Sequence, residues 1–216
     1  MARTRASRSP SKRKPALTGG LYPTVALSDA VNCIGHAWAA KQAYAVGEPD
    51  AALGFALVAE AALVGTLRFG MSERLLAKAN GDLADLAAFV GLPLIGLSFA
   101  QRWARVVLPC DTKAAAIVGL AGLGAVCRSL PDNLQELAKV LLNVVCFVGP
   151  VLAYGHAVED YQTIFGVLLF AVAGVAVGAD RNSCIFGMRR ENWFHYMIAV
   201  SAVLLAAGLA KPLTAQ

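Results

Sequence analysis

The sequence predicts an all-α fold, a polytopic bundle of about seven transmembrane helices. Hydrophobic residues make up 57% of the 216 residues and charged residues only 15%, whereas soluble domains average about 45–50% and about 25%. The apolar residues gather in runs of roughly 17–22, about the length that a helix needs to cross the hydrocarbon core of a bilayer. Because unpaired backbone groups are costly in lipid, we expect each run to be helical.

The chain divides by composition into a short tail and a membrane domain. Residues 1–20 are rich in Arg, Lys, Ser and Pro and contain no acidic residue, which is typical of a disordered, cytosolic tail. An organelle presequence is the alternative interpretation, but Pro10 and Pro15 disfavour the amphipathic helix that such a signal needs. We expect residues 21–211 to form a single seven-helix transmembrane domain.

The apolar runs of the membrane domain define seven predicted spans. The fourth is short and rich in Ala and Gly. Between the second and third spans, MSERLLAKA is expected to form a separate amphipathic helix on the cytoplasmic surface. Pro93 and Pro150, in the similar stretches FVGLPLIG and FVGPVLAYG, are expected to kink the third and fifth spans. The spans cover residues 21–42, 51–67, 83–101, 113–130, 137–157, 160–179 and 189–210.

The basic residues predict the orientation of the bundle, because cytoplasmic segments carry the excess of Lys and Arg. With a cytoplasmic N-terminus, fourteen of the nineteen Lys and Arg residues lie on the inner side. Without the fourth span the same division becomes ten to nine. We therefore expect seven spans and a C-terminus on the opposite side. The endoplasmic reticulum or plasma membrane is the expected location, and an organelle inner membrane is the alternative.

Polar residues form a stripe inside the first span. Asp29, Asn32 and His36 are spaced i, i+3 and i+7, so they lie on one helix face, and Ser28 lies on that face one turn before Asn32. A charged side chain at the centre of a bilayer costs ~2.5–3.5 kcal/mol on insertion scales. Asp29 must therefore pair with a partner, take up a proton or reach water.

Residues of three other spans are predicted to join this stripe. Glu60 lies near the centre of the second span, and the short loop at residues 44–50 makes the first two helices antiparallel neighbours. We expect Glu60 to face Asn32 and to reach toward His36. Asn143 and His195 fall at a depth similar to that of Asp29. The candidate ligand or proton site therefore consists of Asp29, Asn32, His36, Glu60, Asn143 and His195.

Three functions are compatible with these residues. We expect a non-enzymatic membrane subunit or assembly and interaction protein, in which the polar cluster supplies hydrogen bonds between helices. A small-solute or proton transporter that uses Glu60, Asp29 and His36 is the alternative, because intramembrane acids and histidines mark such pathways. An intramembrane lipid-modifying enzyme would need Ser28 beside a histidine base. We assign no catalytic residue and lean against an enzyme.

The sequence lacks the motifs that would indicate a metal ion, a cofactor or retinal. The five cysteines form no CxxC pair and no HExxH motif occurs, so no metal or cofactor is expected. A retinal protein is excluded because residues 189–210 contain no lysine. Nucleic acid is not an expected partner of a membrane bundle. The bilayer is one partner, Arg189 and Arg190 are expected to meet anionic lipid headgroups, and a membrane-protein partner is expected for a subunit.

Overall fold

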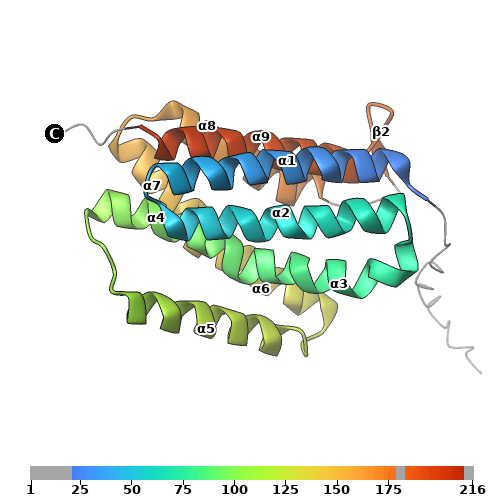
Figure 1. Cartoon of the computed structure of the whole chain (residues 1–216), viewed down its shortest axis with the longest axis horizontal. Coiled ribbons are helices and arrows are strands. Elements are labelled where there is room, and N and C mark those ends of the chain that lie inside the picture. The colour runs from blue at the N-terminus through green and yellow to red at the C-terminus, as the bar shows by residue number, and fades with distance from the viewer. Residues whose placement is uncertain (1–20, 179–182, 212–216) are drawn as a thin grey trace, which may run out of the picture.

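The computed structural model describes residues 21–178 and 183–211, so the predicted tail at residues 1–20 lies outside the described part. The described chain forms seven helical segments that lie side by side, and consecutive segments run in opposite directions (Figure 1). Five segments of this described chain are long and apolar enough to cross a membrane. The predicted all-α class is confirmed, and the helix composition is that of a multi-pass membrane protein.

Each predicted span falls on one helical segment. The segments are α1 (Pro23–Ala45); α2 (Pro49–Gly70); α3 (Glu73–Leu86), the π-helical turn η1 (Ala87–Gly91) and α4 (Leu92–Ala104) in one run; α5 (Cys110–Cys127); α6 (Asp132–Asn143), the π-helical turn η2 (Val144–Val148) and α7 (Gly149–Ala157) in a second run; α8 (Tyr161–Val172) with η3 (Ala173–Val177); and α9 (Arg190–Leu209). A short antiparallel hairpin, β1 (Cys184–Ile185) and β2 (Met188–Arg189), precedes α9.

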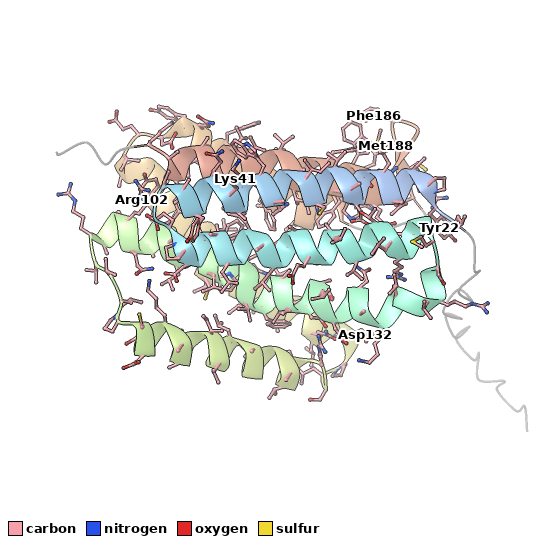
Figure 2. The ribbon with its side chains drawn as sticks, viewed as in Figure 1. Tyr22, Lys41, Arg102, Asp132, Phe186 and Met188 are labelled. Atoms are coloured by element: carbon pink, nitrogen blue, oxygen red, sulfur yellow. The ribbon has the colours of Figure 1, made fainter. Side chains whose placement is uncertain are left out.

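The first two helices are antiparallel neighbours, as the short loop between them predicts. Each begins with a proline in its first turn, Pro23 and Pro49, where the missing N–H costs nothing. Gly47 takes the positive φ of 80° that the connecting turn requires. On its other side α1 packs against α9. Figure 2 shows Tyr22 at one end of the bundle and Arg102 at the other.

The two expected kinks are π-helical turns that directly precede the prolines. Proline lacks an N–H and its ring crowds the carbonyl four residues earlier, which belongs to η1 for Pro93 and to η2 for Pro150. The wider π turn accommodates that carbonyl and keeps the helix continuous. The expectation of a separate surface helix at MSERLLAKA is wrong. This stretch contains the start of α3, which continues without a break through η1 into α4.

Close helix contact in the core depends on glycine. A Cβ atom added to Gly96 of α4 would overlap the backbone of η2 at the carbonyl oxygen of Cys146. Around this contact Phe99 packs edge-on against Tyr154, with ring centroids 5.2 Å apart. The missing side chain of Gly96 therefore sets the distance between the two proline-containing runs, as small residues do in membrane bundles.

Ion pairs at the two ends of the bundle add to the apolar contacts between its segments. Arg128, just after α5, pairs with Asp82 at 2.9 Å and with Asp85 of α3 at 3.0 Å. At the opposite end Arg102 pairs with Glu48 at 3.3 Å and donates to the backbone carbonyl of Leu209. Figure 1 shows α5 set apart from the other helices, and the pairs of Arg128 supplement the apolar cluster in which Cys127 packs with Phe89 and Val90.

We predict that Gly96→Ala destabilises the protein and that Gly119→Ala does not. The added methyl group at position 96 forces α4 away from η2, which should cost about 1–3 kcal/mol of unfolding free energy. A Cβ atom on Gly119 of α5 meets no other atom within 4 Å. Thermal unfolding of the purified variants in one detergent measures the difference, and equal midpoints for the two variants would contradict this packing argument.

A second prediction concerns acid stability at the loop before α8. Burial raises the pKa of Asp160, but hydrogen bonds from Lys211 and Thr163 outweigh it, so the pKa of this carboxyl lies below its usual range. Its contribution to stability is present above the ordinary Asp pKa and is lost as the pH falls through the lowered value. Wild-type protein should lose thermal stability below about pH 4.

Asp160→Asn should have a lower melting temperature than the wild type at neutral pH. Its melting temperature should also fall less steeply as the pH is lowered below about 4. Asp132→Asn, at the exposed start of α6, serves as the control and should follow the wild-type curve. An unchanged acid limb in Asp160→Asn would show that another group controls this loss.

Candidate functional site

A cavity of about 280 Å³ lies between α1, α2, the α3–η1–α4 run and α9. Small side chains make the space, because five alanines line it: Ala61, Ala62, Ala84, Ala87 and Ala88. Phe170, Phe194 and Ile198 close its apolar side. Ala84 is exposed, so the cavity reaches the surface beside α3. Its polar lining consists of Asp29, Asn32, Asn80, Glu191 and His195.

Asp29 lies at the wall of this cavity because Gly65 of α2 makes room for it. A Cβ atom on Gly65 would lie 2.6 Å from Oδ2 of Asp29. The other carboxylate oxygen, Oδ1, lies 3.3 Å from Nε2 of His195 on α9, and both residues are buried. The polar stripe of the first span thus turns toward α2 and α9, and the structure brings Asp29 beside His195, which the sequence analysis placed at a similar depth.

Ser28 holds the other side of the His195 ring. Its Oγ lies 3.0 Å from Nδ1 of His195 and 3.3 Å from Oδ1 of Asn192. The hydroxyl also donates to the backbone oxygen of Val25 at 2.9 Å. A carboxylate only accepts hydrogen bonds, so Nε2 is the donor toward Asp29, whereas the single Ser28 proton is shared among Val25, Asn192 and Nδ1 of His195. The contacts on the two ring nitrogens therefore fix the ring plane of His195.

The chain Ser28–His195–Asp29 contains the residue types of a hydrolase triad, but its accessibility differs from that of a nucleophile. Ser28 is 0% exposed and is absent from the cavity lining. A substrate in the cavity meets His195 and Asp29 and does not reach Oγ, so the geometry lacks the open approach to the reacting carbonyl that acyl transfer needs. The hydroxyl orients His195 from behind.

Two further residues of the predicted stripe have separate surroundings. Asn32 lines the cavity, one turn beyond Ser28. His36 is buried at 2% exposure, and its Nδ1 lies 3.1 Å from the backbone oxygen of Asn32. Its ring packs against Phe55, with centroids 6.1 Å apart. His36 does not line the cavity, so its contacts are those of a core side chain.

Glu60 does not join the cluster, which corrects the expectation that it faces Asn32. Its side chain is exposed. The physical reason is the helical period of α2, which directs Val58, Ala61, Ala62 and Gly65 to the interior and leaves Glu60 on the opposite face.

Asn143 is also placed apart from the expected cluster. It is half-buried at the end of α6, a helix that packs against η1, α4 and α5, and it does not line the cavity. Its Oδ1 atom is shielded from solvent and has no hydrogen-bond partner. The kinked run that contains Asn143 therefore lies on the far side of α4 from Asp29.

Sequence reasoning missed Asn80 and Glu191 as lining residues. Asn80 donates to the backbone oxygen of Ala61 at 3.1 Å and accepts from Arg68 at 2.9 Å. Its signal is the stripe Asn80, Ala84 and Ala88, spaced four residues apart like one face of a helix, which begins just before the third predicted span and continues into it. Glu191 was hidden by its neighbours, because it directly follows the basic pair that we expected to anchor the last span.

The basic pair before α9 makes contacts within the protein. Arg189 lies over the ring of Tyr22, with its guanidinium carbon 5.0 Å from the centroid. Arg190 donates to the backbone carbonyls of Ala176 and Val177 at the end of η3. Their contact with anionic lipid headgroups stays a prediction.

Within residues 21–178 and 183–211, no group of three or more His, Cys, Asp or Glu side chains is arranged to hold a metal ion. No known protein family, curated protein or solved structure matches this chain. The argument about function therefore depends on the geometry of the chain itself.

We predict that Ser28→Ala destabilises the protein by about 1–2 kcal/mol, because it removes the buried hydrogen bond between the Ser28 hydroxyl and Nδ1 of His195. Ser129→Ala is the matched control, since the exposed Ser129 hydroxyl bonds only the backbone oxygen of Val126 in its own turn. Thermal unfolding measures the difference, and nitrogen chemical shifts of ¹⁵N-labelled histidine report the tautomer of His195. Equal losses in the two variants would show that the Ser28 contact is dispensable.

Proposed function

We propose that this chain is a non-enzymatic membrane subunit or assembly and interaction protein, which docks against a transmembrane helix of another protein through α2. The observation that carries the proposal is the exposed carboxyl group of Glu60 in the middle of a membrane-spanning helix. The proposal includes the seven-span topology with a cytoplasmic N-terminus, in the endoplasmic reticulum or plasma membrane.

The depth of Glu60 makes its exposure costly. It lies eleven residues after Pro49 and ten before Gly70, so both ends of α2 are about 15 Å away at a rise of about 1.5 Å per residue. A glutamate side chain cannot span that distance to water. In the part of the chain that the structure describes, Glu60 has no hydrogen bond or ion pair. A charge in this position costs ~2.5–3.5 kcal/mol.

The surroundings of Glu60 are those of a helix-docking surface. Leu53, Leu63 and Leu67 are exposed at 46%, 49% and 40% and share the helix face of Glu60. We call these four residues the α2 docking face. A partner helix that packs on the leucines removes the carboxyl group from lipid and supplies its hydrogen-bond partner.

Charge complementarity defines the partner as a helix with Lys or Arg near mid-bilayer. A second copy of this chain does not fit, because two copies paired through this face would bring two carboxylates together. The described basic residues of this chain also lie within about two turns of a helix end. A different membrane protein is therefore the partner that satisfies Glu60.

The positions of the other ionisable groups support this function over the two alternatives. A transporter that uses Glu60, Asp29 and His36 needs these groups on one path, but Glu60 is exposed, Asp29 lines the cavity and His36 packs against Phe55. A lipid-modifying enzyme needs a reachable nucleophile, and Ser28 is fully buried.

The test is site-specific photo-crosslinking in cells that express the full chain. A photoreactive residue at Leu63 should yield one discrete crosslinked membrane protein, whereas the same residue at Val200, at mid-length on the exposed face of α9, should not. The crosslinked peptide should come from an apolar segment that contains Lys or Arg. The product should disappear in Glu60→Leu and persist in Glu60→Asp.

Exchange of the charges completes the experiment. Glu60→Lys should abolish the crosslink, and replacement of the partner's basic residue by Glu should restore it. Folding is not at risk, because the substitution lies on an exposed face, and a melting curve confirms this. Crosslinks to lipid alone, to a second copy of this chain, or to a protein whose capture ignores the residue at position 60 would each overturn the proposal.

A further inference from the structure

The cavity is lined by a buried acceptor that is unpaired in the described part of the chain. Asn32 is 4% exposed and lines the cavity, and its Oδ1 atom has no hydrogen-bond partner among residues 21–178 and 183–211. Nearly all buried polar atoms in proteins are paired, either within the chain or to a bound molecule. The amide of Asn80, which also lines the cavity, is engaged with other groups: its nitrogen donates to the backbone oxygen of Ala61 and its oxygen accepts from Arg68.

From this arrangement we infer that the cavity binds a small amphipathic molecule whose polar head, a hydroxyl or an amine, donates a hydrogen bond to Oδ1 of Asn32. This site is distinct from the α2 docking face and goes beyond the proposed function.

The remaining lining agrees with a donor head and an apolar body. The carboxylates of Asp29 and Glu191 are acceptors and share the polar end of the cavity with Asn32. An acceptor head such as a carboxylate would meet like charge there. The opposite walls are Val58, Leu92, Phe170, Phe194 and Ile198, which suit a short hydrocarbon chain. A mostly apolar pocket with a few convergent polar groups is the usual form of a small-molecule site.

The position of the cavity gives such a molecule a route of entry. Ala84 lines the cavity and is exposed on α3, and Asn80 one turn earlier is half-exposed. An amphiphile dissolved in the membrane therefore reaches the opening beside α3 without crossing the core of the bundle. Because alanine occupies position 84 on α3 and position 88 on η1, no large side chain obstructs this path.

The experiment uses the purified full chain in lipid nanodiscs and an octanol that carries a photoreactive diazirine. We expect labelling of the α9 peptide that contains Phe194 and Ile198. Octanol and octylamine should compete for this labelling, whereas 1-methoxyheptane, which has the same number of heavy atoms as octanol and no donor, should compete about fivefold less well, the weight of one hydrogen bond. Octanoate should also fail, because its head is an acceptor at neutral pH.

Variants separate the cavity from the rest of the surface. Asn32→Leu should reduce the labelling about fivefold, and Ala88→Leu, which fills the cavity and keeps Asn32, should abolish it. Ala115→Leu, on the exposed surface of α5, is the matched control and should label normally. Melting curves show whether each variant is folded. Asn32→Leu removes the acceptor and Ala88→Leu fills the cavity, so either variant tests the inference if the other does not fold.

Three outcomes would overturn the inference: labelling confined to lipid-facing residues, competition by the ether equal to that by octanol, or full labelling in Asn32→Leu. Glu60→Leu should leave the labelling unchanged, so failure of this inference and failure of the docking proposal are read from different variants.

Discussion

The close approach of α1 to α2 and α9 is the constraint on which the polar interior depends. Gly65 leaves the space that the Asp29 carboxylate occupies, and a Cβ atom on Gly35 of α1 would lie only 3.2 Å from Cβ of Ala199 on α9. At this separation Ser28 and Asp29 contact the two ring nitrogens of His195. Because α1 and the cavity lie against the small-residue face of α2, Glu60 lies on the opposite, outer face. The same helix packing therefore accounts for both the buried network and the exposed acid.

The buried network and the cavity have different energetic characters. In the chain from Ser28 through His195 to Asp29, each contact satisfies a group that would be expensive to leave unpaired in a low-dielectric interior. Asn32 lies one turn further along α1, and its Oδ1 atom has no such partner among the residues that the structure describes. One helix face therefore combines residues that fix the ring of His195 with a residue whose acceptor is the basis of the proposed ligand contact.

The sequence predicted the helices well and the neighbours of the polar residues only in part. Runs of apolar residues identify spans because lipid permits little other than helix, and the i, i+3, i+7 pattern correctly put Asp29, Asn32 and His36 on one face. Depth along a helix does not reveal rotation about its axis, which is why Glu60 was expected inside and is found outside. Asn80 was missed for another reason, because it lies between the expected surface helix at MSERLLAKA and the third predicted span and was assigned to neither. Rotation is set by tertiary packing, here by glycines and alanines whose partners lie on other helices.

The loose attachment of α5 has a consequence of its own. A gap of about 530 Å³ lined by apolar side chains, among them Leu97, Leu120 and Leu123, separates α5 from α4. When the bundle lies in a bilayer, the apolar lining of this gap suits acyl chains, and the tilt of α5 would then respond to the thickness of the surrounding lipid. The cavity and the α2 docking face contain no residue of α5. A change in that tilt would therefore leave the residues of both sites in place.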